Sequence, residues 1–542
     1  MANAFYTLDR PSNDPMRGYL LGSPEKAELK AELKKQAEQV VKIPLIIGGK
    51  EVWTDRTFKV TMPHDHSHVL AECCLAGEKE LKQAVAAALA AKDDWERTPW
   101  EQKIAIFLKA ADYISGSYRK VLMASTMLGQ GKVVFQAEID VAQTADFLRF
   151  NVWNAQEIFK DQPKSGGGAL NRQDYRPLDG FVCAITPFNF TSIGANLPTA
   201  PAIVGNVSLW KPARTAVLSN YYYMKLLMDC GLPAGVINFL PCSGSDMSKY
   251  VLTDPNLAGF HFTGSTEVFR EVWKLVGNNI ENYRSYPRLV GETGGKDFIF
   301  AHSSAEIEPL VAAIIRGAFE LTGQKCSACS RVYVPKSIWP QLKARLVEET
   351  AKLKVGDVTE FDTFMGAVID QDSFRKCKGF LDRAAASPDC TIITGGHADD
   401  SKGWFVEPTI IECADPLYES MVKEIFGPIV SIHPYADEDF DKMLELCDKA
   451  TQYSLTGSIF AKDRKVIEKA EWVLRNASGN FYINDKCTGA VVGQQPFGGA
   501  RASGTNDKAG SILNMIRWLS PHSVKETYCP SPAIAYPYMK EQ

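Results

Sequence analysis

Short apolar segments recur through the middle of the chain, and longer amphipathic stretches separate them. Between residues 181 and 293 the apolar segments are rich in residues that favour strands: FVCAIT, VSLWKP, GVINFLP, GFHFTG and RLVGET. The stretches between them, NLPTAPAIVG, SNYYYMKLLMDC and TEVFREVWKLV, are typical of helices. Strands that alternate with helices form a parallel sheet through crossover connections. The pattern therefore predicts a doubly wound α/β domain over residues 181–291, with its ligand at the strand ends.

A second region of the same kind follows this one. KDFIFAH and CSRVYVPKS predict strands, and AEIEPLVAAIIRGAFEL and IWPQLKARLVEETAKLKVG predict helices. We therefore expect a second α/β domain over residues 292–495. The chain beyond about Ser520 holds four prolines and little periodicity, which is typical of an arm that packs on another part of a structure.

The first 180 residues contain helices and one irregular segment. Residues 23–41 predict a surface helix, because a serine can cap its start and one thin apolar stripe runs along it. Residues 78–94, rich in alanine and leucine, predict another helix. Residues 161–180 contain three consecutive glycines and two prolines, so we expect a loop or an exposed hairpin there.

Composition narrows the classes of function. The chain has 542 residues, 45% of them hydrophobic, and a net charge of −4, which is typical of a globular protein with two or three domains. Because the chain has no excess of basic residues that would attract a polyanion, a nucleic-acid partner is disfavoured. Because no apolar run reaches about 18 residues, we expect no transmembrane helix and no membrane partner.

The cysteines and the N-terminus bear on the compartment. The 13 cysteines are odd in number and scattered, which favours free thiols in a reducing environment. The first 20 residues lack an apolar signal core and include two aspartates, which argues against an intact transit peptide. We therefore expect a cytoplasmic protein, or a mitochondrial matrix protein if the chain is a processed form.

The segment GQKCSACSR places Cys326 and Cys329 in a C-x-x-C spacing. A zinc site needs about four ligands, and the chain has no second C-x-x-C pair. Polar neighbours and the cation of Lys325 lower a thiol pKa, so we expect Cys326 to favour the thiolate, whereas Cys329 begins a predicted strand and should be buried. Chemistry alone ranks structural thiols first, a nucleophilic Cys326 second and a metal site last.

Two other segments offer groups that a cysteine nucleophile requires. Glu292, in VGETGGKDF, can act as a general base if burial raises its pKa. Asn189, in TPFNF, can donate its side-chain amide to an oxyanion. Taken alone, Glu292 is better explained as a surface carboxylate before a turn, and Asn189 as a turn former.

Three further features are compatible with ligand binding. FTGSTEVF follows a strand and opens a helix, which suits an anion, although it does not match G-x-G-x-x-G. Lys211 ends another predicted strand, where a solvated surface charge is the more ordinary explanation. His64, His66 and His68 would share one face of a strand and could bind a metal, but we expect an exposed turn there.

Several of these segments occur in a single order: TPFNF, KPA, FTGSTEV, GETGGK, GQKCSACSR, EIFGP and QPFGG. This set resembles the aldehyde dehydrogenase superfamily. GNFYINDK and VVGQQPFGGARASGTNDK narrow the resemblance to the group that oxidises glutamate γ-semialdehyde. The resemblance runs from about residue 40 nearly to the C-terminus. It implies an α/β fold with a Rossmann-like NAD-binding domain, an α/β catalytic domain and a small oligomerisation arm.

The resemblance also assigns roles to residues. It implies that Cys326 is the nucleophile, Glu292 the general base and Asn189 the oxyanion donor, and that no metal takes part. The residues implied to bind NAD are Thr186, Lys211, Gly264, Ser265, Thr266, Glu267, Val268, Glu424 and Phe426. Those implied to bind the substrate are Ser327, Gly489, Ala490, Phe190 and Phe497.

The chain departs from the family pattern at two positions. Ala490 replaces the usual serine of the carboxylate anchor, which removes one hydroxyl donor and lowers affinity by roughly 1 kcal/mol. Arg214 stands where many relatives carry an acidic residue that contacts the adenosine ribose. An arginine there could accept a 2′-phosphate, so NADP is possible, although NAD is favoured.

The domain boundaries expected from the resemblance divide the chain into five parts, with the first part including the start of the NAD-binding domain. They are 1–162, an oligomerisation hairpin at 163–180, the NAD-binding domain at 181–291, the catalytic domain at 292–495, and a C-terminal return and arm at 496–542. A homodimer with a small-molecule substrate is expected. The alternatives are an enzyme for another acid semialdehyde and a silent NAD-binding protein, and the latter is disfavoured because Cys326, Glu292 and Asn189 occur together. With no barrel domain fitting before residue 40, we expect a monofunctional chain.

Overall fold

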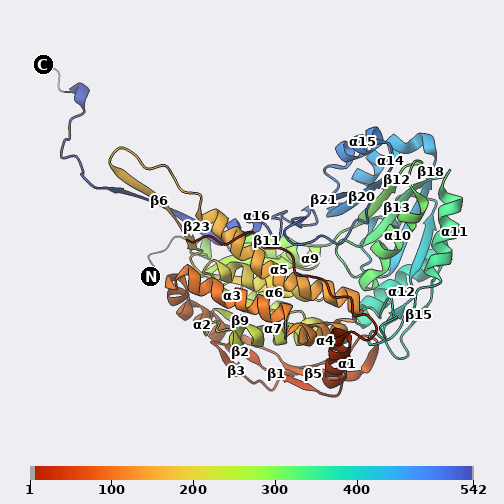
Figure 1. Ribbon diagram of the computed structural model, residues 1–542, viewed down its shortest axis with the longest axis horizontal. Helices are drawn as coiled ribbons and strands as arrows, with labels where there is room; N and C mark the ends of the chain where they lie inside the picture. Colours follow the sequence, from red (N-terminus) through yellow and green to blue (C-terminus); the bar gives the residue numbers. More distant parts are fainter. Residues whose placement is uncertain (1–5, 540–542) are drawn as a thin grey trace.

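A computed structural model describes residues 6–539 (Figure 1). Its first large sheet has seven strands in the order β11-β10-β7-β8-β9-β2-β3. The first five are parallel, whereas β2 and β3 are antiparallel additions at one edge. The strands are β2 (Leu45–Ile47), β3 (Lys50–Val52), β7 (Phe181–Ile185), β8 (Val207–Lys211), β9 (Ile237–Phe239), β10 (Leu257–Thr263) and β11 (Arg288–Glu292).

The chain order reverses beside β7, which is flanked by β8 on one side and by the later strand β10 on the other. Such a reversal leaves a crevice at the carboxyl ends of the two neighbouring strands, where ligands of this architecture bind. The helices predicted between these strands are present. They are α6 (Thr191–Ile203), α7 (Val217–Asp229) and α9 (Thr266–Asn278). A further helix, α8 (Gly244–Tyr250), was not predicted, and α2 (Glu78–Arg97) also packs on β8.

The second large sheet also has seven strands, in the order β14-β17-β18-β13-β12-β20-β21. All are parallel except β14, which is antiparallel to β17. The strands are β12 (Asp297–Ala301), β13 (Cys329–Pro335), β14 (Cys390–Thr394), β17 (Thr409–Cys413), β18 (Ile429–Tyr435), β20 (Thr456–Phe460) and β21 (Asn480–Ile483). Their helices are α10 (Ile307–Phe319), α11 (Trp339–Thr350), α12 (Gln371–Ala386), α14 (Phe440–Lys449) and α15 (Arg464–Leu474). Two sheets of this kind confirm the predicted α/β fold class.

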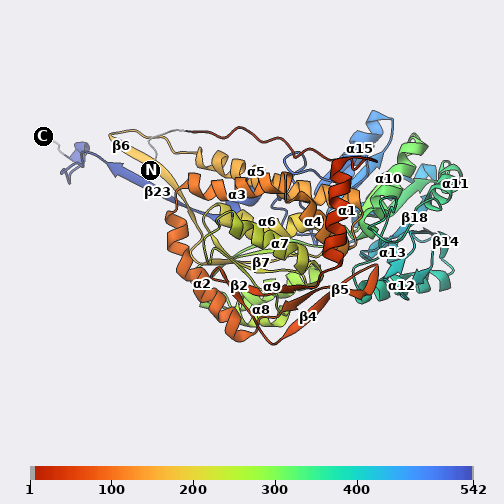
Figure 2. The same ribbon diagram turned by 60° about the horizontal axis from the view of Figure 1, so that its bottom comes forward.

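Three further helices pack on α6 and α7: α3 (Trp100–Ser115), α4 (Arg119–Gln130) and α5 (Val134–Phe159). The predicted N-terminal helix is α1 (Pro24–Ala37), and it packs on α4. Its cap forms as expected, because the Ser23 hydroxyl accepts a hydrogen bond from the backbone N–H of Lys26. Residues 6–20 form neither helix nor strand, and they run along these helices toward α1 (Figure 2).

A two-stranded arm extends away from the rest of the molecule (Figure 1). It consists of β6 (Ala169–Pro177) paired antiparallel with β23 (Leu519–Thr527) along its whole length. The sequence predicted a loop or hairpin within residues 161–180, but only one isolated bridge, Gly166 to Ala169, closes inside that segment. The strand that pairs with β6 is β23, from the C-terminal segment. The backbone N–H and C=O groups of nine strand residues need hydrogen-bond partners along the same length.

The histidine cluster also differs from expectation. His66 and His68 lie on β5 (Asp65–Cys74), which is paired with β4 (Thr57–Met62), and His64 is buried in the preceding turn. The prediction of an exposed turn was wrong, because β4 and β5 form a hairpin and His66 and His68 belong to its second strand. The His66 ring packs on Trp404, with 4.4 Å between ring centroids.

Candidate active site

Cys326 lies where two cavities meet. The larger cavity, of about 870 Å³, opens at the carboxyl ends of β7, β8 and β10. The smaller cavity, of about 120 Å³, lies between α5, the end of β11 and the loop after β21. Cys326 and Thr263 line both cavities. A group bound in either cavity can therefore reach the same thiol.

The turn before Cys326 has an unusual backbone. Leu321, Thr322 and Gly323 have φ values of 54°, 56° and 65°, which place three consecutive residues in the left-handed region. A Cβ atom at Gly323 would lie 2.2 Å from the carbonyl oxygen of Gly427, so only glycine fits there. Left-handed non-glycine residues cost of order 1 kcal/mol or more each, and they persist only where the surroundings hold them. The position of Cys326 is thus set by a tightly constrained turn.

The two cysteines of the C-x-x-C pair have different surroundings. Cys329 is the first residue of β13 and is buried, as predicted, whereas Cys326 is partly exposed. The prediction that Lys325 favours the Cys326 thiolate was wrong, because its ammonium forms an ion pair with Glu320 at 3.0 Å. Burial, followed by the nearby acidic side chains, raises the pKa of Cys326 above its usual value. The thiol therefore needs a proton acceptor before it can attack.

Asn189 is held beside the nucleophile by the backbone next to it. Its side-chain amide donates a hydrogen bond of 3.0 Å to the carbonyl oxygen of Gln324, two residues before Cys326. The Gln324 side chain in turn accepts from the backbone N–H of Ile369 at 2.9 Å. Because a carboxamide nitrogen carries two hydrogens, Asn189 retains one donor for an oxygen bound near the thiol.

A buried polar network fixes the segment that carries Asn189. The carboxylate of Asp140 accepts hydrogen bonds of 2.9 Å from the backbone N–H groups of Thr191 and Ser192, the first residues of α6. Asp140 also pairs with Lys132, whose ammonium lies 5.4 Å from the centre of the Phe190 ring. A carboxylate at a helix N-terminus satisfies free N–H groups and complements the helix dipole. The Asp140 carboxylate therefore holds the backbone of residues 189–192 in place.

Glu292 is the last residue of β11 and faces the smaller cavity. Its carboxylate accepts a hydrogen bond of 3.3 Å from the backbone N–H of Gly499. A Cβ atom at Gly498 would lie 2.8 Å from Oε1, so the glycines leave room for the carboxylate. Burial raises the pKa of Glu292 well above its usual value, and the Lys508 ammonium offsets part of that rise. This is the environment that suits a general base.

The larger cavity collects most residues predicted to bind a dinucleotide. Those on its wall are Thr186, Lys211, Gly264, Ser265, Glu267, Val268, Glu424 and Phe426. The exception is Thr266, whose hydroxyl instead donates to the carbonyl oxygen of Ala502 at 3.2 Å. Ser265 caps α9 by accepting from the N–H of Val268, so the helix directs its free N–H groups at the cavity.

Two residues at the inner end of this cavity are also tightly placed. The Glu424 carboxylate accepts a hydrogen bond of 2.9 Å from the backbone N–H of Gly295. Phe426 has a φ of 63° and packs edge-on against Phe188, with 5.7 Å between centroids. The volume, the position at the chain reversal and the helix N-terminus all fit a dinucleotide that extends to Cys326.

Arg214 is not part of this wall. Its guanidinium stacks on the Phe58 ring of β4, 4.5 Å from the ring centre, and the side chain is exposed. The position predicted to accept a 2′-phosphate is therefore turned toward a different element. Nothing in this geometry favours NADP over NAD.

The smaller cavity contains all five residues predicted to bind the substrate: Ser327, Gly489, Ala490, Phe190 and Phe497. The Ser327 hydroxyl is hydrogen-bonded to that of Thr488 at 2.7 Å. Gly489 has a φ of 100°, and the Lys486 ammonium lies 3.0 Å from where its Cβ would be. A cation, a hydroxyl and backbone N–H groups in a cavity that is also lined by aromatic and aliphatic side chains suit a carboxylate attached to an aliphatic chain.

Sequence reasoning missed several residues of this wall. They are Gln143, Glu320, Lys486 and Thr488, and Lys325 was assigned to the thiol instead of to Glu320. Lys486 and Thr488 belong to the segment NDKCTGA, which also contains Gly489. Their closeness in sequence to this predicted anchor residue could have identified them. Gln143 comes from the middle of α5, where no local signal marks it.

Among residues 6–539, no group of three or more His, Cys, Asp and Glu side chains is arranged to hold a metal ion. His66 and His68 instead contact the backbone carbonyl oxygens of Asp400 and Ala37, at 3.0 Å and 2.7 Å. Within the same residues, none of the helices has the length and apolar character needed to cross a bilayer.

Comparisons with known proteins identify the family of the chain. Residues 52–520 match the model of the aldehyde dehydrogenase family. The Δ1-pyrroline-5-carboxylate dehydrogenase of Dictyostelium discoideum, named mitochondrial, is 52% identical over 98% of this chain and 96% of the relative. The human enzyme, also named mitochondrial, is 48% identical over 98% of this chain and 94% of its own length.

Two solved structures are similar over nearly the whole chain. The Mycobacterium tuberculosis Δ-pyrroline-5-carboxylate dehydrogenase bound with NAD has 48% identity and a TM-score of 0.96, covering 99% of this chain and 100% of that one. The Thermus 1-pyrroline-5-carboxylate dehydrogenase with bound NAD has 29% identity and a TM-score of 0.90, covering 96% and 100%.

Proposed function

Because the chain belongs to the aldehyde dehydrogenase family, we propose that it oxidises glutamate γ-semialdehyde to glutamate with NAD. This reaction is the second step of proline catabolism, and the aldehyde forms when Δ1-pyrroline-5-carboxylate opens by hydrolysis. The observation that carries the proposal is the position of Cys326 between a dinucleotide-sized cavity and a small cavity with a carboxylate anchor.

The first half of the reaction uses Cys326 and Asn189. The Cys326 thiol first gives its proton to water, so the Glu292 carboxylate in the same cavity stays unprotonated for the second half of the reaction. The thiolate then adds to the aldehyde carbon, and the amide of Asn189 and the backbone N–H of Cys326 stabilise the oxyanion. NAD, held by residues of the larger cavity such as Lys211 and Glu424, would supply the acceptor for the hydride that this carbon loses. The aldehyde carbon is oxidised, and a thioester remains on Cys326.

The second half of the reaction releases the acid. Glu292 takes a proton from water, and the resulting hydroxide attacks the thioester carbon. The carbon–sulfur bond breaks, the Cys326 thiolate leaves, and glutamate is released. Burial of Glu292 suits this step, because a raised pKa makes its carboxylate a stronger base.

Recognition of the substrate is assigned to the smaller cavity. Ser327 and the backbone N–H groups at Gly489 and Ala490 bind the carboxylate, while Phe190 and Phe497 flank the aliphatic chain. Lys486 adds a positive charge to the same end. The missing hydroxyl at Ala490 weakens this anchor by one hydrogen bond without removing it.

In this proposal the two α/β regions have different roles. Residues 181–291 supply most of the NAD cavity, and residues 292–495 supply the nucleophile, the anchor, and Glu424 and Phe426 of the NAD cavity. The arm of β6 and β23 is mostly exposed, and it carries the apolar residue Leu170 and is followed by the exposed Tyr528, which supports pairing with a second copy of the chain in a homodimer. The names of the relatives favour the mitochondrial matrix of the two predicted compartments.

The test is a spectrophotometric assay of NADH formation from Δ1-pyrroline-5-carboxylate. We expect activity in the wild type, none in Cys326→Ser, and retention in the matched Cys329→Ala variant. Wild-type protein that is inert with this substrate, yet oxidises another acid semialdehyde or pentanal, would contradict the substrate assignment.

A further inference from the structure

The N-terminal strap, residues 8–19, lies along α5 and is docked on it at three points (Figure 2). At one end, the backbone N–H of Leu8 donates to the Gln156 side chain at 2.6 Å, and that side chain donates back to the Leu8 carbonyl at 3.1 Å. In the middle, the N–H of Asp14 donates to Asp146 at 2.8 Å. Near the other end, the N–H of Arg17 donates to Glu138 at 2.6 Å. The strap therefore has one register along the helix.

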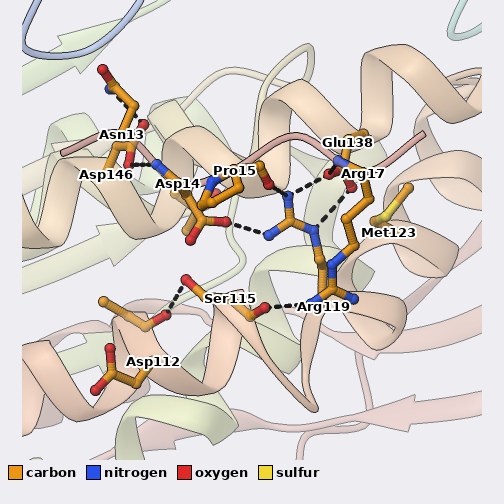
Figure 3. Close-up of polar contacts among 12 residues, drawn as sticks. Asn13, Asp14, Pro15, Arg17, Asp112, Ser115, Arg119, Met123, Glu138 and Asp146 are labelled. Carbon is orange, nitrogen blue, oxygen red and sulfur yellow. Dashed lines mark hydrogen bonds and ion pairs between the residues drawn. The ribbon is translucent and has the colours of Figure 1, made fainter. Parts of the chain in front are cut away.

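A buried charge cluster holds that register, as Figure 3 shows. The Arg119 guanidinium, which is 1% exposed, pairs with the carboxylates of Asp14 and Glu138. It also donates to the carbonyl oxygen of Pro15 at 3.2 Å, and the Tyr19 hydroxyl donates to Glu138 at 2.7 Å. A buried charge that loses its partner is strongly destabilised, so sliding or release of the strap is costly.

Asn13 connects this docked strap to the substrate cavity. Its amide nitrogen donates to Asp146 at 2.8 Å and to the carbonyl oxygen of Val492 at 2.7 Å. Its amide oxygen accepts from the Gln494 side chain at 2.8 Å. The neighbouring Arg10 adds a hydrogen bond of 3.0 Å to the carbonyl oxygen of Gly493. Asn13 thus uses both amide hydrogens and its oxygen to join α5 to one loop.

That loop carries the carboxylate anchor. Residues 484–499 contain no helix or strand and only one isolated backbone bridge, from Phe497 to Ala509, so backbone pairing alone does not fix the part of the loop near Gly489. Gly489 and Ala490 lie three and two residues before Val492, and the Ala490 carbonyl accepts from the Gln143 side chain of α5 at 2.9 Å. The anchor is therefore held from α5 on one side, by Gln143, and from the strap on the other, by Asn13.

We propose that Asn13 is a positioning residue for the substrate carboxylate, acting through the loop of Gly489 and Ala490. This inference rests on the proposed function. The strap makes substrate recognition depend on residues more than 470 positions away in sequence. Because Asn13 supports the anchor and not Cys326, its loss weakens binding of a carboxylated aldehyde while the chemical step is preserved.

The experiment compares Asn13→Ala with wild type on two five-carbon aldehydes, glutamate γ-semialdehyde and pentanal, which lacks the carboxylate. We expect the KM for glutamate γ-semialdehyde to rise about ten-fold, on the scale of one hydrogen bond. We expect kcat, and both constants for pentanal, to stay within about two-fold. Ser12→Ala is the matched control, because Ser12 is an exposed neighbour on the strap and should change neither substrate.

A second variant removes a contact of Asn13 at an exposed position, where a substitution is less able to disturb folding. Gln494→Ala removes the donor to the Asn13 amide oxygen at an exposed position, and it should raise the same KM by a smaller factor. Equal changes for both aldehydes, or a fall in kcat with unchanged KM, would overturn the positioning role in favour of general stability. If the wild type oxidises glutamate γ-semialdehyde and both variants match it, the inference alone fails. An inert wild type overturns the proposed function, and the inference with it.

Discussion

The two cavities that meet at Cys326 are built in different ways. Much of the wall of the larger cavity comes from the ends of neighbouring strands and the segments that follow them, as in the turn from Gly264 to Val268 and the helix α9 that it opens. The smaller cavity is assembled from α5, β11, the turn before Cys326 and the loop of residues 484–499. That loop is in turn supported by the N-terminal strap. One cavity thus depends on local turns at a chain reversal, and the other on contacts between distant segments.

Because the two cavities are built differently, substitutions in one should have different effects from substitutions in the other. A change at a strand end should alter cofactor binding and leave discrimination between aldehydes intact. A change in the smaller cavity, or in its supports, should alter which aldehyde is bound and leave the affinity for NAD intact. Residues that take part in the chemistry, such as Cys326 and Glu292, should affect every aldehyde equally.

The largest effect is expected at the shared residue. Cys326→Ser should lower kcat by roughly 10⁴-fold for glutamate γ-semialdehyde and pentanal alike, because no thioester can form. Steady-state assays with both aldehydes measure this. Unchanged quenching of protein fluorescence by NAD serves as the control, and loss with only one aldehyde would break the assignment of Cys326 to both cavities.

Removal of the general base should separate the two halves of the reaction. Glu292→Gln should lower the steady-state rate about 10²- to 10⁴-fold, since the thioester is no longer hydrolysed efficiently. A burst of NADH approaching one per site should remain in stopped-flow traces, with another base or solvent taking the thiol proton. Absence of the burst would show that Glu292 is needed before hydride transfer.

The pH dependence of the wild type follows from the same residue. Glu292 acts as the carboxylate, and burial raises its pKa, so its protonated form persists to higher pH than for an exposed glutamate. The deacylation rate should therefore fall as the pH decreases through this raised pKa. In single-turnover experiments on preformed thioester, that acid limb should be missing from Glu292→Gln.

Substitutions at the anchor should affect one aldehyde only. Ser327→Ala should raise the KM for glutamate γ-semialdehyde about ten-fold, and Ala490→Ser should lower it by up to about five-fold. Pentanal oxidation is the internal control and should be unchanged in both. An equal shift for pentanal would place Ser327 in the chemistry and not in the anchor.

The smallest effect is expected at Arg214. Because its guanidinium stacks on Phe58 outside the cavity wall, Arg214→Ala should keep the ratio of kcat/KM for NAD and NADP within about two-fold. Lys211→Ala, on the wall, is the comparison and should raise the KM for both cofactors. A large change in the ratio at Arg214 would mean that the side chain turns toward the ribose when cofactor binds.

The sequence predicted the locally built parts of the molecule well. Strand ends such as Glu292 and caps such as Ser265 follow from short-range patterns, since apolar segments and helix starts are determined by their neighbours. The pairing of Lys325 with Glu320 was missed, because the fold of the turn between them decides which partner the ammonium meets. The prediction from composition around Cys326 alone gave the wrong direction for its pKa.

Long-range contacts were the least predictable. Asn13 and Val492 are separated by 479 positions, and β6 pairs with β23 across more than 340 residues. No periodicity or motif marks such partners, because each contact depends on how two finished elements are packed. For the same reason the substrate cavity was predicted only where the family resemblance supplied residues such as Ser327.

The central claim is that Cys326 carries the oxidised substrate as a thioester. Its most direct test is peptide mass spectrometry of Glu292→Gln after mixing with NAD and glutamate γ-semialdehyde and quenching in acid. We predict a glutamyl adduct on the peptide that contains Cys326, at that residue and not at Cys329, removable by hydroxylamine. Formation of NADH with Cys326 unmodified, or with the adduct on another residue, would contradict the account.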